Sequence, residues 1–220
     1  MQEVLIVAHG SPSSPDGPEA WLSALARQVQ ALCPQLRVRA ATLARPGSLQ
    51  SALEALAHPS IYPFFMAEGW FTRKELPRRL AELGREAPIL PPFGTDPNLP
   101  ALLAQALAGT GLGAVILAAH GSAVAPASKA QAEALAQQLG EILPGRQMVV
   151  GLIEEPPFLR DIAARHPTAT CLPLFALRAG HVESDIPQAL AEGGFTGRLL
   201  DPIGEHPAVP ELIAQALARR

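Results

Sequence analysis

The segment Val4–Ser11 has the sequence VLIVAHGS, and a close copy of it, VILAAHGS, occupies Val115–Ser122 about 111 positions later. Both copies open with a short apolar run of the kind that forms a buried strand in a parallel sheet. His-Gly-Ser follows in both, and glycine permits the tight turn that leads from a strand into a helix. The pair therefore predicts two similar α/β halves in one chain.

Further matches between the two halves follow in the same order and at nearly the same spacing. Pro63–Pro77 matches Pro173–Pro187, Gly94–Pro100 matches Gly204–Pro210, and Ala104–Leu107 matches Ala214–Leu217. Because repeats in one constant order indicate a duplicated unit, we divide the chain into residues 1–110 and 111–220. The glycine-rich turn Gly109–Gly111 marks the boundary.

Each half alternates short Val-, Ile- and Leu-rich runs with Ala-, Leu-, Glu- and Arg-rich segments at helical spacing. We expect strands near residues 2–8, 36–43, 60–66, 87–91, 113–119, 147–153, 169–175 and 197–200. Alternating βα units form parallel sheets with right-handed crossovers. The predicted fold class is therefore α/β, with two tandem flavodoxin-like halves, each a four-stranded parallel sheet with helices on both faces.

Composition excludes several classes of protein. The 220 residues carry Lys+Arg 17 against Asp+Glu 20, a net charge of −3, which argues against a nucleic-acid binder. Apolar runs such as Ala114–Ala119 are too short to cross a bilayer, and Met1–Glu3 does not resemble the start of a signal peptide. Cys33 and Cys171 lie far apart without CxxC spacing, so we expect small buried side chains. These features favour a cytoplasmic protein.

Three histidines occupy the predicted ligand-binding edge of the sheets. Ligands of open parallel sheets bind beyond the carboxyl ends of the strands, where His9 and His120 follow the first strand of each half. His181 follows the third strand of the second half, and flavodoxin-like order makes strands one and three neighbours, so His120 and His181 should converge. Two imidazoles suit a divalent ion such as cobalt, iron or nickel. The alternative, a hydrogen-bonded packing histidine, is weakened by the repeated turn and the additional histidine.

Carboxylates and turns surround this edge. Glu183 and Asp185 follow His181 closely, and either can add an oxygen ligand or accept a proton. Asp185 matches Glu75, so it can equally serve as the start of a helix. Backbone N–H groups of the two turns can hold an anion, with Ser11, Gly121 and Ser122 as the residues concerned.

The first half departs from the second at this edge. We align Trp70 with His181 and Thr72 with Glu183, so that only the second half has two histidines. An indole cannot ligate a divalent cation, and Trp70 either stacks on a flat ligand or packs in the core. His9 remains available to face a ligand from the opposite wall of a cleft.

Taken together, the motifs resemble those of the sirohydrochlorin chelatases, or class II chelatases, in the two-domain form, over nearly the whole chain. The motifs that carry the resemblance are Val7–Ser11, Pro173–Phe175, Gly180–Val182, Asp185–Pro187 and Pro202–Pro207. The resemblance implies a lyase that inserts a divalent metal, Co²⁺ first and Fe²⁺ or Ni²⁺ as alternatives, into a sirohydrochlorin-like tetrapyrrole. That step belongs to cobalamin or sirohaem biosynthesis.

The resemblance also implies two chelatase-like halves that face each other across a tetrapyrrole-binding cleft. The metal is then a substrate, no cofactor is permanently bound, and the chain is a monomer or homodimer.

The resemblance assigns the two metal histidines to His120 and His181. From the chemistry of insertion we add proton transfer at these histidines, His9 as a helper and Glu183 as a group that passes protons to water. Two-domain members commonly keep this pair in the first half, and Ala123 stands where an arginine is frequent in the family. The tetrapyrrole carries many carboxylates, for which the candidate partners are Ser13, Ser14, Arg73, Lys129 and Arg178.

Two other functions are considered. A chelatase-derived protein that binds a tetrapyrrole or a metal without catalysis would explain the missing histidine of the first half. A hydrolase or phosphotransferase is disfavoured because the chain has no Gly-x-Ser-x-Gly motif. Ala8 and Ala119 also stand where an arginine would precede a phospho-accepting histidine.

Overall fold

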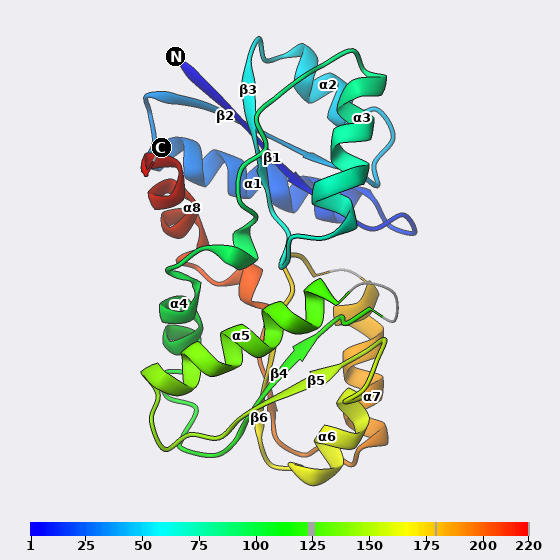
Figure 1. Cartoon of the computed structure of the whole chain (residues 1–220), viewed down its shortest axis with the longest axis vertical. Helices are drawn as coiled ribbons and strands as arrows, with labels where there is room; N and C mark the ends of the chain where they lie inside the picture. Colours follow the sequence, from blue (N-terminus) through cyan, green and yellow to red (C-terminus); the bar gives the residue numbers. More distant parts are fainter. Residues whose placement is uncertain (123–125, 179, 220) are drawn as a thin grey trace. The chain divides into compact units, whose positions relative to one another are not determined.

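The computed structural model describes residues 1–122, 126–178 and 180–219, and it shows two parallel sheets flanked by helices (Figure 1). The predicted α/β class with two tandem halves is confirmed. None of the helices in the described part of the chain combines the length and apolar character needed to cross a membrane.

The first half builds a sheet with the strand order β2-β1-β3, in which every pairing is parallel. Its elements are β1 (Gln2–Ala8), α1 (Asp16–Leu32), β2 (Leu36–Thr42), α2 (Ser48–Glu54), β3 (Pro59–Pro63), the π-helical turn η1 (Phe71–Glu75), α3 (Leu76–Glu82), η2 (Phe93–Thr95) and α4 (Leu99–Ala106). The fourth strand predicted at residues 87–91 is reduced to an isolated bridge between Ile61 and Ile89. Pro88 and Pro91 explain this correction, because proline has no N–H for a strand ladder.

The second half builds a sheet with the order β5-β4-β6-β7, again parallel throughout. Its elements are β4 (Val115–Ala119), α5 (Ala127–Ile142), β5 (Met148–Leu152), α6 (Leu159–Arg165), β6 (Thr170–Pro173), the π-helical turn η3 (His181–Asp185), α7 (Ile186–Glu192), β7 (Arg198–Leu199), η4 (Ile203–Glu205) and α8 (Val209–Ala218). Here the four predicted strands are present, the last with two residues.

Helices cover both faces of each sheet. Leu5 and Val7 join a buried cluster with α2 and α3, whereas the alternate residues of β1 point to the face that α1 covers. In the second half Ile116 and Ala118 pack with α6 and α7, and α5 lies against β4 and β5. Cys33 and Cys171 are buried as expected, and burial raises the pKa of the Cys171 thiol to about 12. The apolar runs of the sequence thus form two cores, one for each sheet.

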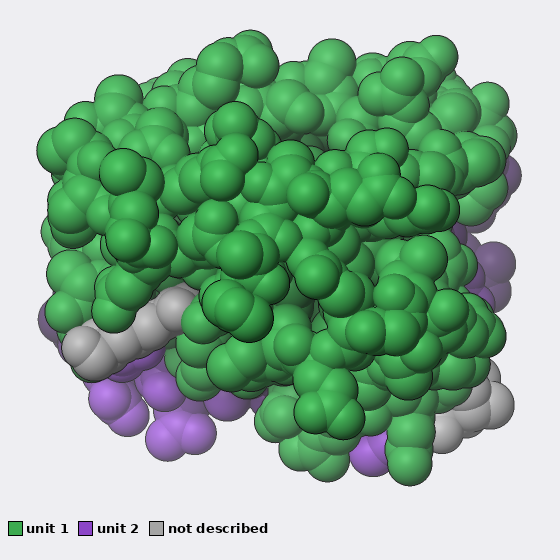
Figure 2. Space-filling view, turned by 90° about the horizontal axis from the view of Figure 1, so that it is seen from above, with its two compact units in different colours: residues 1–96, 207–220 green, residues 97–206 purple. Residues whose placement is uncertain are grey.

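The compact units of the structure differ from the expected division at residues 1–110 and 111–220. One unit comprises residues 1–96 and 207–220, and the other comprises residues 97–206; Figure 2 colours them separately. The last helix of each repeat causes the difference, because α4 packs on α5 and α8 packs on α1. Arg219, just after α8, also pairs with the buried carboxylate of Asp96 at 2.5 Å. The closing helices of the two repeats are therefore exchanged.

Candidate metal-binding site

His120 and His181 are brought together at the carboxyl edge of the second sheet. His120 directly follows β4, and His181 opens the turn η3 that follows the neighbouring strand β6. Their Nε2 atoms lie 3.0 Å apart, and the two rings are nearly perpendicular with their centroids 4.4 Å apart. The predicted convergence of the two side chains is confirmed.

Hydrogen bonds fix the tautomer of both rings. His120 Nδ1 lies 2.7 Å from the carbonyl oxygen of Gly121, and His181 Nδ1 lies 2.5 Å from Asp185 Oδ2. A carbonyl and a carboxylate only accept hydrogen bonds, so each Nδ1 atom is the donor, and in a neutral ring the Nε2 atom then presents a lone pair. Two unprotonated Nε2 atoms 3.0 Å apart repel unless a cation lies between them. Metal–nitrogen bonds of about 2.1 Å would meet at about 90° across this gap.

Glu154 completes the donor set. In the described part of the chain, one group of three or more His, Cys, Asp or Glu residues has ligand atoms within 4.8 Å of one another. It comprises His120, Glu154 and His181. Glu154 lies just beyond β5, and its N–H donates to the carbonyl oxygen of His120 at 2.9 Å. Sequence analysis missed Glu154, although its position after a strand beside β4 was a usable signal. The three neighbouring strands β5, β4 and β6 therefore each position one donor.

Of the two carboxylates expected next to His181, Asp185 makes the contact. Glu183 is exposed on the same turn η3, whereas Asp185 is partly buried and bonded to the imidazole. The Ser184 hydroxyl and His181 hold the pKa of Asp185 below its ordinary value, so this carboxyl group is ionised at neutral pH. Asp185 thus supplies a negative charge on the Nδ1 side of His181.

The turn amides expected to bind an anion already have partners within the protein. Gly121 has a positive φ of 73°, which allows the turn, and its N–H donates to Ser128 Oγ at 3.1 Å. The N–H of Ser122 donates to Glu155 Oε1 at 2.8 Å. In the first half Ser11 is buried, and its hydroxyl lies 3.1 Å from that of Ser13. These amides therefore build the turn that carries His120.

The cations suggested for the tetrapyrrole carboxylates also have partners. Arg178 pairs with Glu205 and Asp201, and Arg73 pairs with Glu68 at 2.9 Å. The remaining candidates are placed as follows: Lys129 Nζ donates to the Pro156 carbonyl at 3.1 Å, Ser14 is exposed, and Ala123 lies outside the described residues. A carboxylate ligand would have to compete with these internal partners.

The corresponding edge of the first half has lost two of the three donors. Ala44 donates its N–H to the His9 carbonyl at 2.8 Å, as Glu154 does to His120, so Ala44 takes the position of Glu154. The turn η1 begins at Phe71 where η3 begins at His181. The His9 and Phe71 ring centroids lie 4.4 Å apart, the same separation as in the histidine pair.

Phe71, and not Trp70, therefore replaces His181, which corrects the alignment made from sequence. Ala8 corresponds to Ala119 at an offset of 111, but Thr42 corresponds to Leu152 at an offset of 110. The connection between these strands is one residue shorter in the second half, which shifts every later match. By the same shift Trp70 corresponds to Gly180, and Arg73 takes the position of Glu183 that was assigned to Thr72.

Trp70 nevertheless presents an apolar surface at this edge. Its side chain is 57% exposed, and its ring meets Phe71 edge-on at a centroid distance of 5.0 Å. Phe71 in turn lies against Phe65 at 5.9 Å. The first half thus carries an aromatic cluster where the second half carries metal donors.

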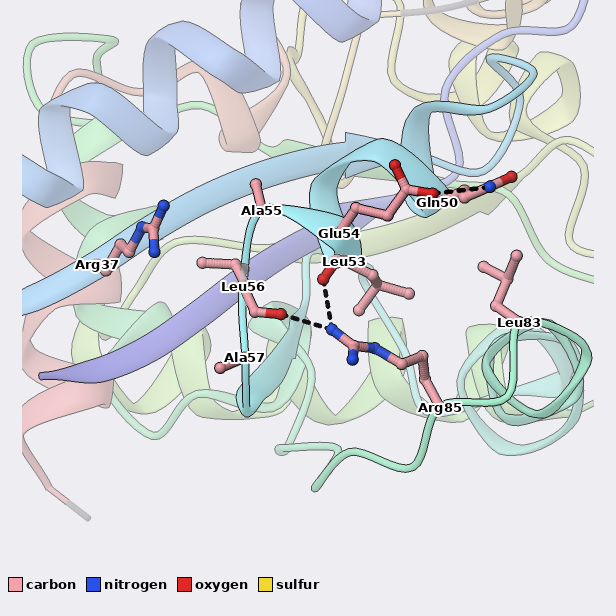
Figure 3. A pocket seen from close by; sticks show the side chains of 9 residues that line it. All are labelled: Arg37, Gln50, Leu53, Glu54, Ala55, Leu56, Ala57, Leu83 and Arg85. Atoms are coloured by element: carbon pink, nitrogen blue, oxygen red, sulfur yellow. Dashed lines mark hydrogen bonds between the residues drawn. The ribbon is translucent and has the colours of Figure 1, made fainter.

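A surface pocket of about 610 Å³ lies elsewhere on the first half, and Figure 3 shows its lining. Arg85 donates from one nitrogen to the carbonyl oxygens of Leu53 and Leu56, and Arg37 lies on another wall. None of the nine lining residues belongs to the predicted site. We therefore place the chemistry at the carboxyl edge of the second sheet.

Comparison with known proteins identifies the family. A model of the CbiX family matches residues 3–110 and, a second time, residues 114–220. The chain is 45% identical to a solved protein described as CbiX, the terminal enzyme for biosynthesis of siroheme in denitrifying bacteria, with a TM-score of 0.86 and 99% of both chains covered. No curated protein matches the chain.

More distant structures share the fold. SirB from Bacillus subtilis, solved with Fe³⁺, is 16% identical with a TM-score of 0.79, and the match covers 100% of this chain and 95% of SirB. The sirohydrochlorin chelatase SirB from the subspecies spizizenii, in complex with cobalt, is 14% identical with a TM-score of 0.73 and the same coverage. At this level of identity the likeness concerns the fold alone. The double match to the family model and the 45% identity place the chain in the CbiX family of sirohydrochlorin chelatases.

Proposed function

We propose that this chain inserts a divalent metal ion into sirohydrochlorin and that His120, Glu154 and His181 hold the ion beforehand. The observation that carries the proposal is the pair of Nε2 atoms, which lie 3.0 Å apart with Glu154 beside them. Two unprotonated nitrogens this close repel each other without a cation between them, so the arrangement is suited to binding one. Membership in the CbiX family supports the same function.

The donor set suits a metal that must be released again. Two imidazoles and one carboxylate leave coordination positions open, whereas a closed cage of four protein ligands would retain the ion. During insertion the tetrapyrrole loses two pyrrole protons, and the metal exchanges its protein and water ligands for ring nitrogens. A histidine Nε2 atom that the metal has left can accept one proton. Glu154 is exposed and can transfer a proton to water.

The choice of ion is the finer part of the proposal. Imidazole and carboxylate donors accept Co²⁺, Fe²⁺ and Ni²⁺ alike, so the donor set does not discriminate among them. Co²⁺ is the ion expected from the sequence. The relative at 45% identity is described as an enzyme of siroheme biosynthesis, which favours Fe²⁺ as the second ion to test.

We also propose a role for the first half in holding the substrate. The indole of Trp70 is exposed, and flat conjugated rings stack favourably on such side chains. His9 is exposed at the same edge and stays a candidate for proton transfer. In this proposal the donors of the second half hold the metal, and Trp70 is a candidate for stacking on the tetrapyrrole.

The test is an anaerobic absorbance assay of the purified protein with sirohydrochlorin and Co²⁺, Fe²⁺ or Ni²⁺. We expect the spectrum of the metallated product to appear faster than in a reaction without protein, and the fastest ion identifies the preferred metal. A His120→Ala, His181→Ala double variant is the matched control. Tetrapyrrole binding without acceleration by any ion would contradict the proposal and support a non-catalytic binding protein.

A further inference from the structure

We propose that Asp185 is a positioning residue, which holds His181 in the tautomer and orientation that direct its Nε2 atom to the metal. The inference rests on the proposed metal-binding function. A metal-bound histidine commonly donates its other ring N–H to a carboxylate, which fixes the ring and makes the ligand nitrogen more basic. The 2.5 Å contact from His181 Nδ1 to Asp185 Oδ2 has this form.

The position of Asp185 argues against direct ligation of the metal. It contacts Nδ1 of the His181 ring, whereas Nε2 on the other side of that ring lies 3.0 Å from Nε2 of His120. The carboxylate is itself held in place, since Ser184 Oγ lies 2.8 Å from Asp185 Oδ1 and 2.6 Å from the Gly180 carbonyl. Asp185 therefore acts on the metal through His181.

The first half provides an internal comparison. Glu75 ends the turn η1 as Asp185 ends η3, but Phe71 offers no ring nitrogen for it to bind. Both Glu75 oxygens instead bind arginines: Oε1 contacts Arg78 at 2.9 Å and Arg79 at 2.6 Å, and Oε2 contacts Arg78 at 3.0 Å. If the acid at this position only started the following helix, Glu75 and Asp185 would be expected to have similar partners. Instead the acid binds arginines where η1 begins with Phe71, and it binds the imidazole where η3 begins with His181.

The experiment compares Asp185→Asn with Glu75→Gln in the full chain, by titration with Co²⁺ alone and by thermal melting. We expect Asp185→Asn to weaken Co²⁺ binding about 10- to 100-fold, the usual cost of losing such a partner. Its melting temperature should change little, because Asp185 is partly exposed. Glu75→Gln should do the reverse, lowering the melting temperature and leaving Co²⁺ affinity unchanged. Asp185→Glu should recover part of the lost affinity.

The imidazole tautomer gives a readout that does not depend on the variants folding. Nitrogen-15 NMR of the metal-free protein, at a pH where the ring is neutral, should show His181 protonated at Nδ1 and not at Nε2. An Nε2-protonated ring, or unchanged Co²⁺ affinity in Asp185→Asn, would overturn the role of Asp185. If the unmodified protein fails to bind Co²⁺, the proposed metal site is wrong, whereas the NMR result still decides how Asp185 acts on His181.

Discussion

The two sheet edges of this chain have the same architecture and different side chains. Both have a His-Gly-Ser turn after the first strand and a five-residue π-helical turn after the third. At the three equivalent positions the second half has His120, Glu154 and His181, and the first half has His9, Ala44 and Phe71. The common backbone shows that the fold does not require the donors, so their presence in one half points to function.

The largest expected effect comes from removing one donor. His181→Ala should lower the rate of metal insertion by more than the about 100-fold that loss of a supporting residue can cost, because a direct ligand is lost. His9→Ala, which removes the histidine from the edge of the first half, should reduce the rate far less. Both are checked in the anaerobic absorbance assay. Equal rates for the two variants would show that the asymmetry of the halves has no catalytic meaning.

The comparison is sharpened by restoring the lost donors. The double substitution Ala44→Glu, Phe71→His should raise the number of bound Co²⁺ ions from one to two, because it recreates the donor set beside His9. Equilibrium dialysis measures this stoichiometry. Trp70→His is the control, and it should add no ion, since Trp70 corresponds to Gly180 rather than to His181.

A double variant that is folded by circular dichroism and still binds one ion would contradict the equivalence of the two edges. The backbone of η1 would then hold its first side chain in an orientation that differs from that in η3. Each single substitution supplies two of the three donors and should bind the second ion more weakly than the double variant.

A smaller effect is expected from the aromatic cluster. Trp70→Ala should raise the KM for sirohydrochlorin about tenfold with kcat unchanged, since stacking on an exposed aromatic ring contributes about 1–3 kcal/mol. Trp21→Phe is the matched control, because Trp21 stacks on Phe64 at 6.1 Å and takes no part in the proposed surface. A KM for Trp70→Ala within a factor of two of the unmodified value would leave Trp70 as an ordinary surface residue.

The fold was predictable to the extent that local pattern determines it. Alternating apolar runs located the strands, and Pro88 with Pro91 explains why the segment around Ile89 forms only a bridge. The exchange of α4 and α8 was not predictable. The matching segments Ala104–Leu107 and Ala214–Leu217 give both helices a similar apolar face, so either helix can pack on either sheet.

The site was predictable where strand order alone sets proximity. His120 and His181 follow neighbouring strands, so the convergence of their side chains could be inferred from the sequence alone. Glu154 was missed because its Glu-Glu-Pro-Pro context resembles the start of a helix. Phe71 was missed because a one-residue difference in an earlier connection displaces the alignment. The partner of each ring nitrogen depends on distances of a few tenths of an ångström, which no sequence pattern specifies.

The smallest expected effect concerns the stability that Glu75 provides. Its contacts with Arg78 and Arg79 lower the pKa of the Glu75 carboxyl from 4.5 to about 2, so the folded state favours the charged form. This contribution is complete above the ordinary pKa and is lost as the pH falls from 4.5 towards about 2. Glu75→Gln should therefore lower the melting temperature at neutral pH by about 4 °C, a modest loss of stability for a chain of this length.

The difference in melting temperature between Glu75→Gln and the unmodified protein should then shrink as the pH falls through this range. Asp185→Asn is the matched variant, and its difference from the unmodified protein should be small at neutral pH once a chelator has removed Co²⁺. A Glu75→Gln difference that persists at about pH 2 would mean that packing, rather than charge, makes this position important to the first half. Glu75 and Asp185 would then differ in burial alone. The ion pairs of Glu75 with arginine and of Asp185 with His181 would no longer explain why each half has an acid at the end of its π-helical turn.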